Sequence, residues 1–289
     1  MCESPMSNAF GKMERGSCRI RWEGGMDHWR GKWALITGAS AGIGAAMARE
    51  LAAGGTNLVL TARRGDRLAS LAAELGDKHK IRALVCVADL ALPLGAQQIF
   101  SFTEEGQIVI DLLVNNAGFG AYGEFHKTAL ERLVDMTKVN VTAVVQMTHL
   151  YLPGMIARKS GDILIVASTA AFQAVPYIST YAATKAFDLY FAEGLAEEAR
   201  PYGVHVCALC PGSTETEFFQ VAGQRNHTRR APESAEKVAH VGLAALAAGK
   251  TSVISGFSNW LGAEAVRLVP RRTVARVTAG IFRPKEKPA

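Results

Sequence analysis

The sequence has no apolar run of about 18 residues, the length that a membrane-spanning helix needs, so no such helix is predicted. Its 289 residues include only five cysteines, whose positions form neither a metal-binding set nor a disulfide framework. Cys207 and Cys210 have the Cys-x-x-Cys spacing, but they fall in an apolar strand pattern, in which residues three apart face opposite ways. We therefore expect buried, inert thiols, no metal site and a reducing, cytoplasmic compartment.

The first 29 residues lack hydrophobic periodicity. They contain no apolar segment followed by a cleavage site, so no signal peptide is predicted. We expect residues 1–29 to be a disordered extension and residues 30–264 to form one domain. The 49% hydrophobic content is ample for a buried core.

Apolar runs alternate with helical patterns from Trp33 onward, without internal repeats or low-complexity tracts. This alternation predicts an α/β fold, namely a single doubly wound parallel sheet (Rossmann-like) with helices on both faces. Strands are expected near residues 33–37, 56–62, 85–90, 110–114, 163–167 and 204–210, and helices near 45–53, 94–105, 130–157 and 181–199.

A glycine-rich turn follows the first predicted strand, with glycines at positions 38, 42 and 44. Such a turn lets the backbone approach a pyrophosphate, whose charge is favoured at the N-terminus of the next helix. The spacing differs from Gly-x-Gly-x-x-Gly, so that fingerprint alone does not identify a dinucleotide site. A second polar turn, residues 115–118, follows the strand predicted near 110–114.

One stretch holds a hydroxyl, a phenol and an ammonium in order: Ser168, Tyr181 and Lys185. Ser168 ends a predicted parallel strand, where open α/β sheets place their ligand crevice. Tyr181 and Lys185 are four residues apart on a predicted helix and so share a face. The ammonium favours the phenolate and is expected to lower the pKa of Tyr181, which would serve as an acid/base near neutral pH. Tyr-x-x-x-Lys also occurs on ordinary helices where the lysine is merely solvated.

Together these motifs resemble the short-chain dehydrogenase/reductase family, in its single-domain branch. They occur in family order over roughly residues 30–255, and the spacing of 13 residues between Ser168 and Tyr181 is part of the match. The resemblance implies a catalytic tetrad of Asn140, Ser168, Tyr181 and Lys185. The expected cofactor-binding set is Gly38, Ser40, Gly42, Ile43, Gly44, Arg63, Arg64, Asp89, Asn116, Tyr181, Lys185, Pro211, Gly212 and Thr216.

The end of the second predicted strand bears on the choice of cofactor. An acid there would bind the ribose of NAD, whereas arginine accommodates the 2′-phosphate of NADP. Here Ala62 is followed by Arg63 and Arg64, so NADP(H) is predicted over NAD(H), and Ser40 could add a hydroxyl. The alternative is a solvated arginine pair. Asp89 either contacts the adenine ring or caps a helix.

The predicted function is NADP(H)-dependent reduction of a carbonyl to an alcohol, or the reverse, with Tyr181 as acid/base and Asn140 holding a water linked to Lys185. A polar segment after Gly212, reaching Pro232, is expected to form a lid. An extended-branch epimerase would need a larger carboxyl-terminal domain, and a non-catalytic NADP-binding regulatory or scaffold protein is the alternative from another class. A homo-oligomer is expected. An apolar small-molecule substrate could be lined by Phe119, Phe172, Val175, Tyr177, Phe218 and Phe219.

The last 25 residues form a basic tail. The chain has a net charge of +6, and of its 32 basic and 26 acidic residues, seven and one lie in residues 265–289. Drawn as a helix, residues 271–283 place arginines opposite a stripe of Val274, Val277 and Ile281. The tail either lies on an anionic membrane or packs on the protein or a neighbouring subunit, and the short stripe favours packing. No nucleic-acid binding is expected, because the rest of the chain is net neutral.

Overall fold

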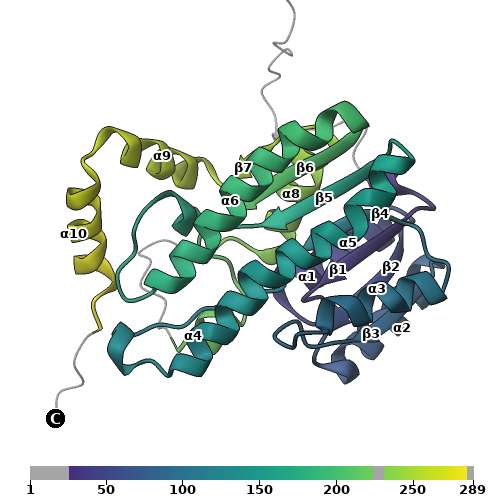
Figure 1. The fold of residues 1–289 in the computed structure, drawn as a ribbon, viewed down its shortest axis with the longest axis horizontal. Helices are drawn as coiled ribbons and strands as arrows, with labels where there is room; N and C mark the ends of the chain where they lie inside the picture. The colour runs from purple at the N-terminus through teal and green to yellow at the C-terminus, as the bar shows by residue number, and fades with distance from the viewer. Residues whose placement is uncertain (1–25, 224–230, 285–289) are drawn as a thin grey trace, which may run out of the picture.

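The computed structural model describes residues 26–223 and 231–284. In these residues one sheet has seven strands, all parallel, in the order β3-β2-β1-β4-β5-β6-β7 (Figure 1). The order reverses between β1 and β4, which places a ligand crevice beyond the carboxyl ends of these strands. The strands are β1 (Trp33–Thr37), β2 (Asn57–Ala62), β3 (Ala83–Val87), β4 (Ile110–Asn115), β5 (Gly161–Val166), β6 (Val204–Cys210) and β7 (Ser252–Ile254).

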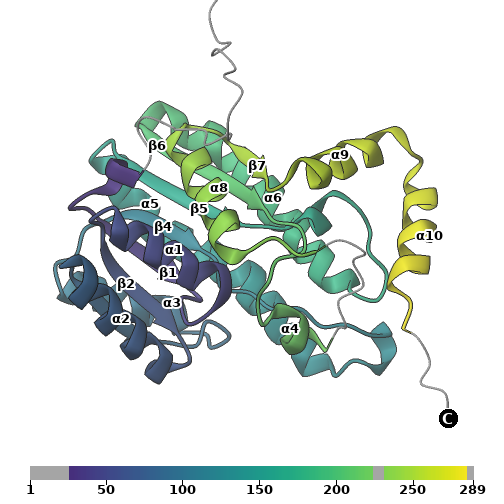
Figure 2. The same ribbon diagram turned by 180° about the vertical axis from the view of Figure 1, so that it is seen from behind.

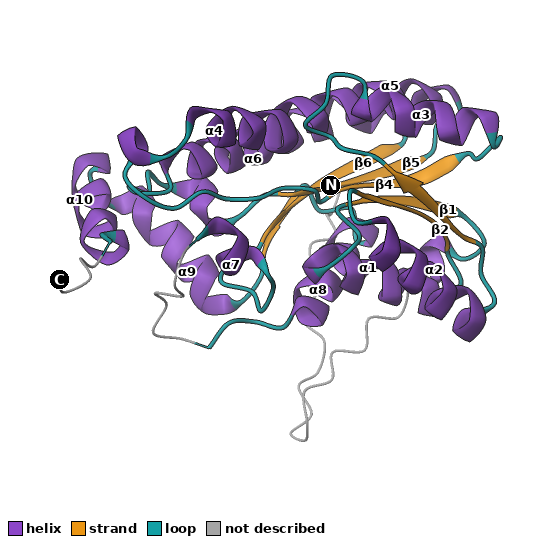
Figure 3. Cartoon of the chain, turned by 90° about the horizontal axis from the view of Figure 1, so that it is seen from below, coloured by secondary structure: helices purple, strands orange, loops and turns teal. Residues whose placement is uncertain are grey.

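Helices cover both faces of the sheet, which confirms the predicted fold class (Figure 3). Alternate strand residues feed two separate apolar cores, one on each face. Cys207 belongs to one core and Cys210 to the other, as expected, and burial raises the pKa of both thiols to about 12. One face carries α1 (Gly42–Ala53), α2 (Gly65–His79) and α8 (Ala235–Ala247); the other carries α3 (Gly95–Glu105), α4 (Leu130–Thr137), α5 (Ala143–Ala157) and α6 (Ser179–Ala199) (Figures 2 and 3).

The helix predicted near residues 130–157 is interrupted by one π-helical turn, Lys138–Thr142, between α4 and α5. Such turns insert an extra residue and re-aim neighbouring side chains, and they occur often at functional sites. Here the turn contains Asn140, whose side chain is fully buried.

The amino-terminal boundary of the fold differs from the expectation of disorder through residue 29. Met26–Trp29 forms a 3-10 turn, and Trp29 is completely buried. Trp29 donates its indole N–H to Asp162 Oδ2 over 2.8 Å, and Asp162 also contacts His28 and His205 at 3.0 and 3.1 Å. A single turn has no periodicity to detect, so the sequence pattern did not reveal this anchor. Residues 1–25 lie outside the described part.

The carboxyl-terminal helices α9 (Phe257–Ala265) and α10 (Arg271–Phe282) lie at the end of the molecule away from α2 (Figures 1 and 2). The Thr278 hydroxyl donates to Ala174 O at 3.0 Å, and the Phe282 carbonyl accepts from the Tyr122 hydroxyl at 2.8 Å. The contact face of α10 is therefore not the predicted stripe, since Val277 and Ile281 are 58% and 54% exposed. Among the described residues, none of the helices has the length and hydropathy to cross a bilayer.

Candidate functional site

The glycine-rich turn lies between β1 and α1. Gly38 and Gly42 have φ values of +68° and +56°, which favour glycine. A Cβ atom at Gly44 would stand 2.5 Å from Asn116 Nδ2 and 2.6 Å from Gly38 O. Since α1 begins at Gly42 without a side-chain cap, its first N–H groups point out of the turn. The turn can therefore bind an anion through the backbone N–H groups at the start of α1.

Thr37 and Asn116 join this turn to the end of β4. The Thr37 hydroxyl donates to Val114 O at 3.1 Å and accepts the N–H groups of Asn116 and Ala117 at 2.9 and 3.0 Å. The Asn116 amide donates to Thr37 O at 2.8 Å. Asn116 thus supports the turn, while its expected contact with the cofactor stays a prediction. Thr37 is a supporting residue that the sequence showed only as part of the motif.

A cluster of charged side chains lies at the end of β2. Arg64 donates through Nε and Nη2 to Ser40 Oγ, at 3.1 and 3.0 Å. Its Nη1 lies 2.7 Å from Glu217 Oε2, and Arg67 Nη1 lies 2.6 Å from Glu217 Oε1. The two guanidinium groups hold the pKa of Glu217 below its usual range. The predicted Ser40 and Arg64 are therefore together, whereas Arg67 and Glu217 were missed because their pairing joins distant segments.

Arg63 and Asp89 form the adjoining edge of this cluster. Arg63 is mostly exposed, and its Nη1 lies 4.0 Å from Asp89 Oδ2. Asp89 Oδ1 accepts the Ala91 N–H at 2.9 Å, so Asp89 caps a local turn ahead of α3. Of the two predicted arginines, Arg64 faces the glycine-rich turn through Ser40.

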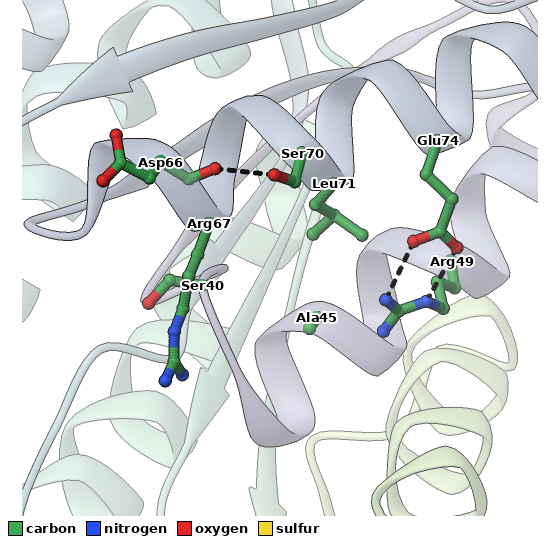
Figure 4. Close-up of a pocket in the computed structure, with 8 residues that line it drawn as sticks. All are labelled: Ser40, Ala45, Arg49, Asp66, Arg67, Ser70, Leu71 and Glu74. Atoms are coloured by element: carbon green, nitrogen blue, oxygen red, sulfur yellow. Dashed lines mark hydrogen bonds and ion pairs between the residues drawn. The ribbon is translucent and has the colours of Figure 1, made fainter.

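An open pocket of about 290 Å³ extends from this cluster between α1 and α2 (Figure 4). In this pocket Arg67 extends past Ser40. At the other end Arg49 and Glu74 form a bidentate ion pair, in which both nitrogen-to-oxygen distances are 3.1 Å. Neither Ser168 nor Tyr181 lines this pocket. The pocket therefore adjoins the Arg64 cluster and is not the place of the hydroxyl, phenol and ammonium.

Ser168, Tyr181 and Lys185 come together at the carboxyl end of β5. Ser168 follows the strand, accepts the Ala170 N–H at 3.1 Å and donates to Pro211 O at 3.5 Å. Tyr181 and Lys185 lie one turn apart on α6 with exposures of 9% and 5%, and Lys185 Nζ is 6.0 Å from the Tyr181 ring. The structure therefore brings the three predicted residues together. Because Lys185 is buried, the alternative of a solvated lysine is wrong.

Burial changes the expected acidity of Tyr181. Lys185 does lower the pKa of the phenol, as predicted, and the Ser168 hydroxyl acts in the same direction. Burial is the larger effect, however, and the net pKa of Tyr181 is raised, which corrects the expectation of a fall toward neutrality. A buried phenol that stays protonated at neutral pH is suited to donating a proton.

Asn140 connects the segment after β4 to α6. Its amide donates to Phe119 O and Thr184 Oγ1, both at 3.1 Å, and its Oδ1 accepts the Phe119 N–H at 3.1 Å. Both N–H groups are therefore used by the protein. A water linking Asn140 to Lys185 stays a prediction, and it would have to bond the remaining lone pair of Oδ1 or the main chain.

The segment after β6 returns to the glycine-rich turn. The methyl group of Thr216 lies 3.0 Å from the position of a Cβ at Gly42. Gly212 is packed against Asn259 of α9, whose amide would be 2.4 Å from a Cβ there. Thr216 thus lies beside the glycine-rich turn, while the cofactor contacts expected of Pro211, Gly212 and Thr216 stay predictions. The predicted lid residues 224–230 are outside the described part.

Apolar side chains surround the Tyr181 ring. Phe218, on the short helix α7 (Phe218–Ala222), has its ring centroid 5.0 Å from that of Tyr181. Phe119 and Val175 belong to the same cluster, as does Phe282 of α10, which sequence analysis had not placed here. Phe172 instead packs into the sheet core. Tyr177 has a φ of +68°, an unfavourable value for a side chain of this size.

The fold and site are those of a dinucleotide-binding α/β protein with a serine, tyrosine and lysine at the crevice. The chain belongs to the short-chain dehydrogenase family, whose model matches residues 32–227. It is 31% identical to a very-long-chain 3-oxoacyl-CoA reductase of Homo sapiens, over 88% of this chain and 84% of the relative. A solved short-chain dehydrogenase from Sphingobium yanoikuyae in complex with NADPH has a TM-score of 0.75 and 30% identity, covering 82% of this chain and 94% of the other.

Other relatives limit what these similarities imply. The chain spans about half the length, 53%, of the curated relatives that it matches with 37% and 35% identity. It is also 34% identical to a protein of Pongo abelii described as an inactive hydroxysteroid dehydrogenase-like protein 1, over 63% of this chain and 55% of that relative. Membership of the family is therefore compatible with either an active or an inactive protein.

Proposed function

We propose that this protein is an NADP(H)-dependent oxidoreductase that reduces a carbonyl to an alcohol, or catalyses the reverse reaction, on an apolar substrate. The observation that carries the proposal is that Ser168 and the buried Tyr181 and Lys185 come together at the carboxyl end of β5, in the crevice that the glycine-rich turn borders. A protein that only bound a dinucleotide would not need a phenol beside a buried ammonium.

The residues present fit an NADP(H) molecule. The crowded glycines of the turn and the uncapped start of α1 suit a pyrophosphate, and Arg64 with Ser40 suits a 2′-phosphate. Arginine binds phosphate through paired N–H groups, which favours NADP(H) over NAD(H). Lys185 and Thr216 would hold the nicotinamide end. When bound, the cofactor supplies or accepts the hydride.

The side chains divide the remaining chemistry among them. Ser168 hydrogen-bonds the substrate oxygen and orients the carbonyl. Tyr181 donates its proton to that oxygen during reduction, and its raised pKa keeps the proton in place at neutral pH. Lys185 stabilises the phenolate that remains. Asn140 fixes the segment after β4 against α6, and so keeps Tyr181 and Lys185 in register with the crevice.

The wall around Tyr181 supports an apolar substrate. Phe119, Val175, Phe218 and Phe282 belong to the same apolar cluster as Tyr181, so they offer hydrocarbon surface to a substrate beside the phenol. The names of the relatives include reductases of long-chain acyl groups. A carbonyl compound with a substantial apolar part therefore suits this site better than a sugar.

The proposal is tested by following NADPH absorbance with purified protein and a panel of apolar ketones, aldehydes and 3-oxoacyl thioesters. Tyr181→Phe should lower turnover about 10²- to 10⁴-fold, because it removes only the proton donor. NADPH affinity, measured by fluorescence titration, should stay close to that of the unaltered protein. Unchanged turnover in this variant would remove Tyr181 from the mechanism.

The non-catalytic alternative is retained because a relative described as inactive exists. A regulatory or scaffold protein would bind NADPH with normal affinity but oxidise it with no member of the panel. The complete set of Asn140, Ser168, Tyr181 and Lys185 favours the enzyme.

Assembly and location are part of the same proposal. Val145 on α5 and Phe187 and Tyr190 on α6 are exposed, and they would be covered in a homo-oligomer paired through these helices. The cytoplasm is the proposed compartment. Peripheral membrane contact is proposed through α9 and α10, where exposed Phe257, Trp260 and Leu268 accompany the arginines of the tail.

A further inference from the structure

Asp188 is a buried acid that none of the roles above uses. It lies on α6, three residues after Lys185, and its side chain has no exposure to solvent. Its Oδ2 is 2.9 Å from Lys185 Nζ, while its Oδ1 has no hydrogen-bond partner. A fully buried carboxylate with an unsatisfied oxygen is costly to the fold, so a position beside the ammonium calls for an explanation.

The carboxylate determines where Lys185 can reach. Two of the three N–H groups of the ammonium point inward, one to Asp188 and one to the Val166 carbonyl at the end of β5, at 2.7 Å. The third N–H is not used by either of them, and Gly118 packs beside the ammonium, since a Cβ there would stand 3.5 Å from Nζ. Asp188 and Val166 thus hold the ammonium at a fixed depth beneath the Tyr181 phenol.

We propose that Asp188 is a positioning residue that keeps Lys185 protonated and retracted toward β5, and thereby offsets part of the field that Lys185 exerts on Tyr181. This inference rests on the proposed function, because it assigns a role within the same site. Asp188 thereby adds to the effect of burial in retaining the proton of Tyr181 beside a buried cation 6.0 Å from the ring.

The charges around the pair agree with this role. Burial alone would lower the pKa of Lys185, but Asp188 reverses the effect and the net pKa is raised. The same carboxylate acts on Tyr181 in the direction that raises its pKa, against Lys185. Within residues 26–223 and 231–284, the other titratable group that acts on Lys185 is Cys210 at the end of β6, which burial keeps neutral by raising its pKa to about 12. Burial also raises the pKa of Asp188, and Lys185 opposes that rise. Because the ammonium lies 2.9 Å from Oδ2, we assign the negative charge beside the pair to Asp188.

The sign of the expected change follows from electrostatics. A nearby anion disfavours loss of a proton from either Tyr181 or Lys185, so its removal must lower the apparent pKa of the coupled pair, whichever residue releases the proton. Reduction needs both groups protonated. When Asp188 is replaced by a neutral residue, activity should therefore be lost at a lower pH on the alkaline side of the profile.

The variant Asp188→Asn removes the charge and nearly preserves the volume. We expect the alkaline limb of the kcat/KM profile for carbonyl reduction to move about one unit or more toward lower pH, since a charge at this range shifts pKa values by about 1 to 3 units. The matched control is Glu198→Gln, which removes an exposed acid from the same helix and should leave the limb in place. An unmoved limb in Asp188→Asn, or a shift to higher pH, would overturn the proposal.

A second measurement needs no turnover. The phenolate absorbance is titrated against pH without substrate, in the unaltered protein and in Asp188→Asn. Each titration is repeated with Tyr181→Phe added, and the difference between the two curves gives the contribution of Tyr181. The titration should move to lower pH in Asp188→Asn even if no substrate is found, which separates this inference from the proposed function. If Asp188→Asn does not fold, Asp188→Ser removes the same charge and should give the same shift. A lower melting temperature with an unmoved titration would leave Asp188 a purely structural residue and refute the proposal.

Discussion

At the scale of single residues, Arg64 and Arg63 make different contacts although they are neighbours in the sequence. Arg64 bonds Ser40 beside the glycine-rich turn, whereas Arg63 extends toward Asp89 at 4.0 Å. We expect Arg64→Ala to lower NADPH affinity by roughly one to two decades, because a charge-assisted contact contributes about 1.5 to 3 kcal/mol. NADH affinity should barely change. Titration of both cofactors against each variant measures the effect.

Two further variants act as controls for this prediction. Arg63→Ala should lose less NADPH affinity than Arg64→Ala. Glu217→Gln should gain affinity, because Glu217 now occupies the guanidinium groups of Arg64 and Arg67 that a phosphate would need. Equal losses of NADPH and NADH affinity in Arg64→Ala would mean that Arg64 does not distinguish the cofactors.

Residues differ in how far the sequence could predict them. Ser168, Tyr181 and Lys185 were predictable because a strand end and a helical spacing, both local patterns, bring them together. Asp188 follows the same helical spacing, yet its burial depends on β5 and β6, which the sequence does not place in space. Glu217 meets its partners across 153 positions of the chain, so no local pattern reveals the ion pairs.

At the scale of elements, the 3-10 turn before β1 serves as an anchor. Trp29 is fully buried and bonds Asp162 on β5. A chain that begins at Met26 should melt at the same temperature as the full chain. Trp29→Ala should lose about 3 to 5 kcal/mol of unfolding free energy, since it leaves a cavity and removes a donor from a buried carboxylate.

Thermal or denaturant unfolding of these variants measures the contribution of the anchor. Trp29→Phe keeps much of the ring volume but removes the indole N–H. Its free energy of unfolding should therefore lie between those of the unaltered protein and Trp29→Ala. If Trp29→Ala unfolded at the same denaturant concentration as the full chain, the turn would have no anchoring role.

The order and type of the elements were largely predictable, because alternating apolar strands and helical patterns are local and strong. The remainder depends on long-range packing. The strand β7 has only three residues, Ser252–Ile254, and no independent signal. The π-helical turn at Asn140 looks like ordinary helix in the sequence. Which face of α10 packs on the protein depends on Thr278 and Phe282, because they form hydrogen bonds with residues more than a hundred positions away.

At the scale of the whole molecule, we expect the exposed surface of α9 and α10 to be the part of the protein that binds a membrane. The protein should sediment with anionic vesicles but not with neutral ones, and added salt should weaken the binding. Deleting residues 270–289 should reduce it. Replacing Trp260 and Leu268 with serine tests the apolar contribution without changing charge. Failure to bind anionic vesicles at low salt would leave the tail as a packing or assembly element.

The position of the arginines in α10 also affects how copies of the protein meet one another in solution. Residues 1–264 are net neutral, so the whole excess of +6 lies in the tail, and α10 is at one end of the molecule (Figure 1). Net charge keeps proteins apart, and chains near zero charge tend to precipitate. The tail is therefore the main source of colloidal repulsion at neutral pH. Any polyanion that neutralises it would remove this repulsion, and the bound molecules could then crowd together on that surface.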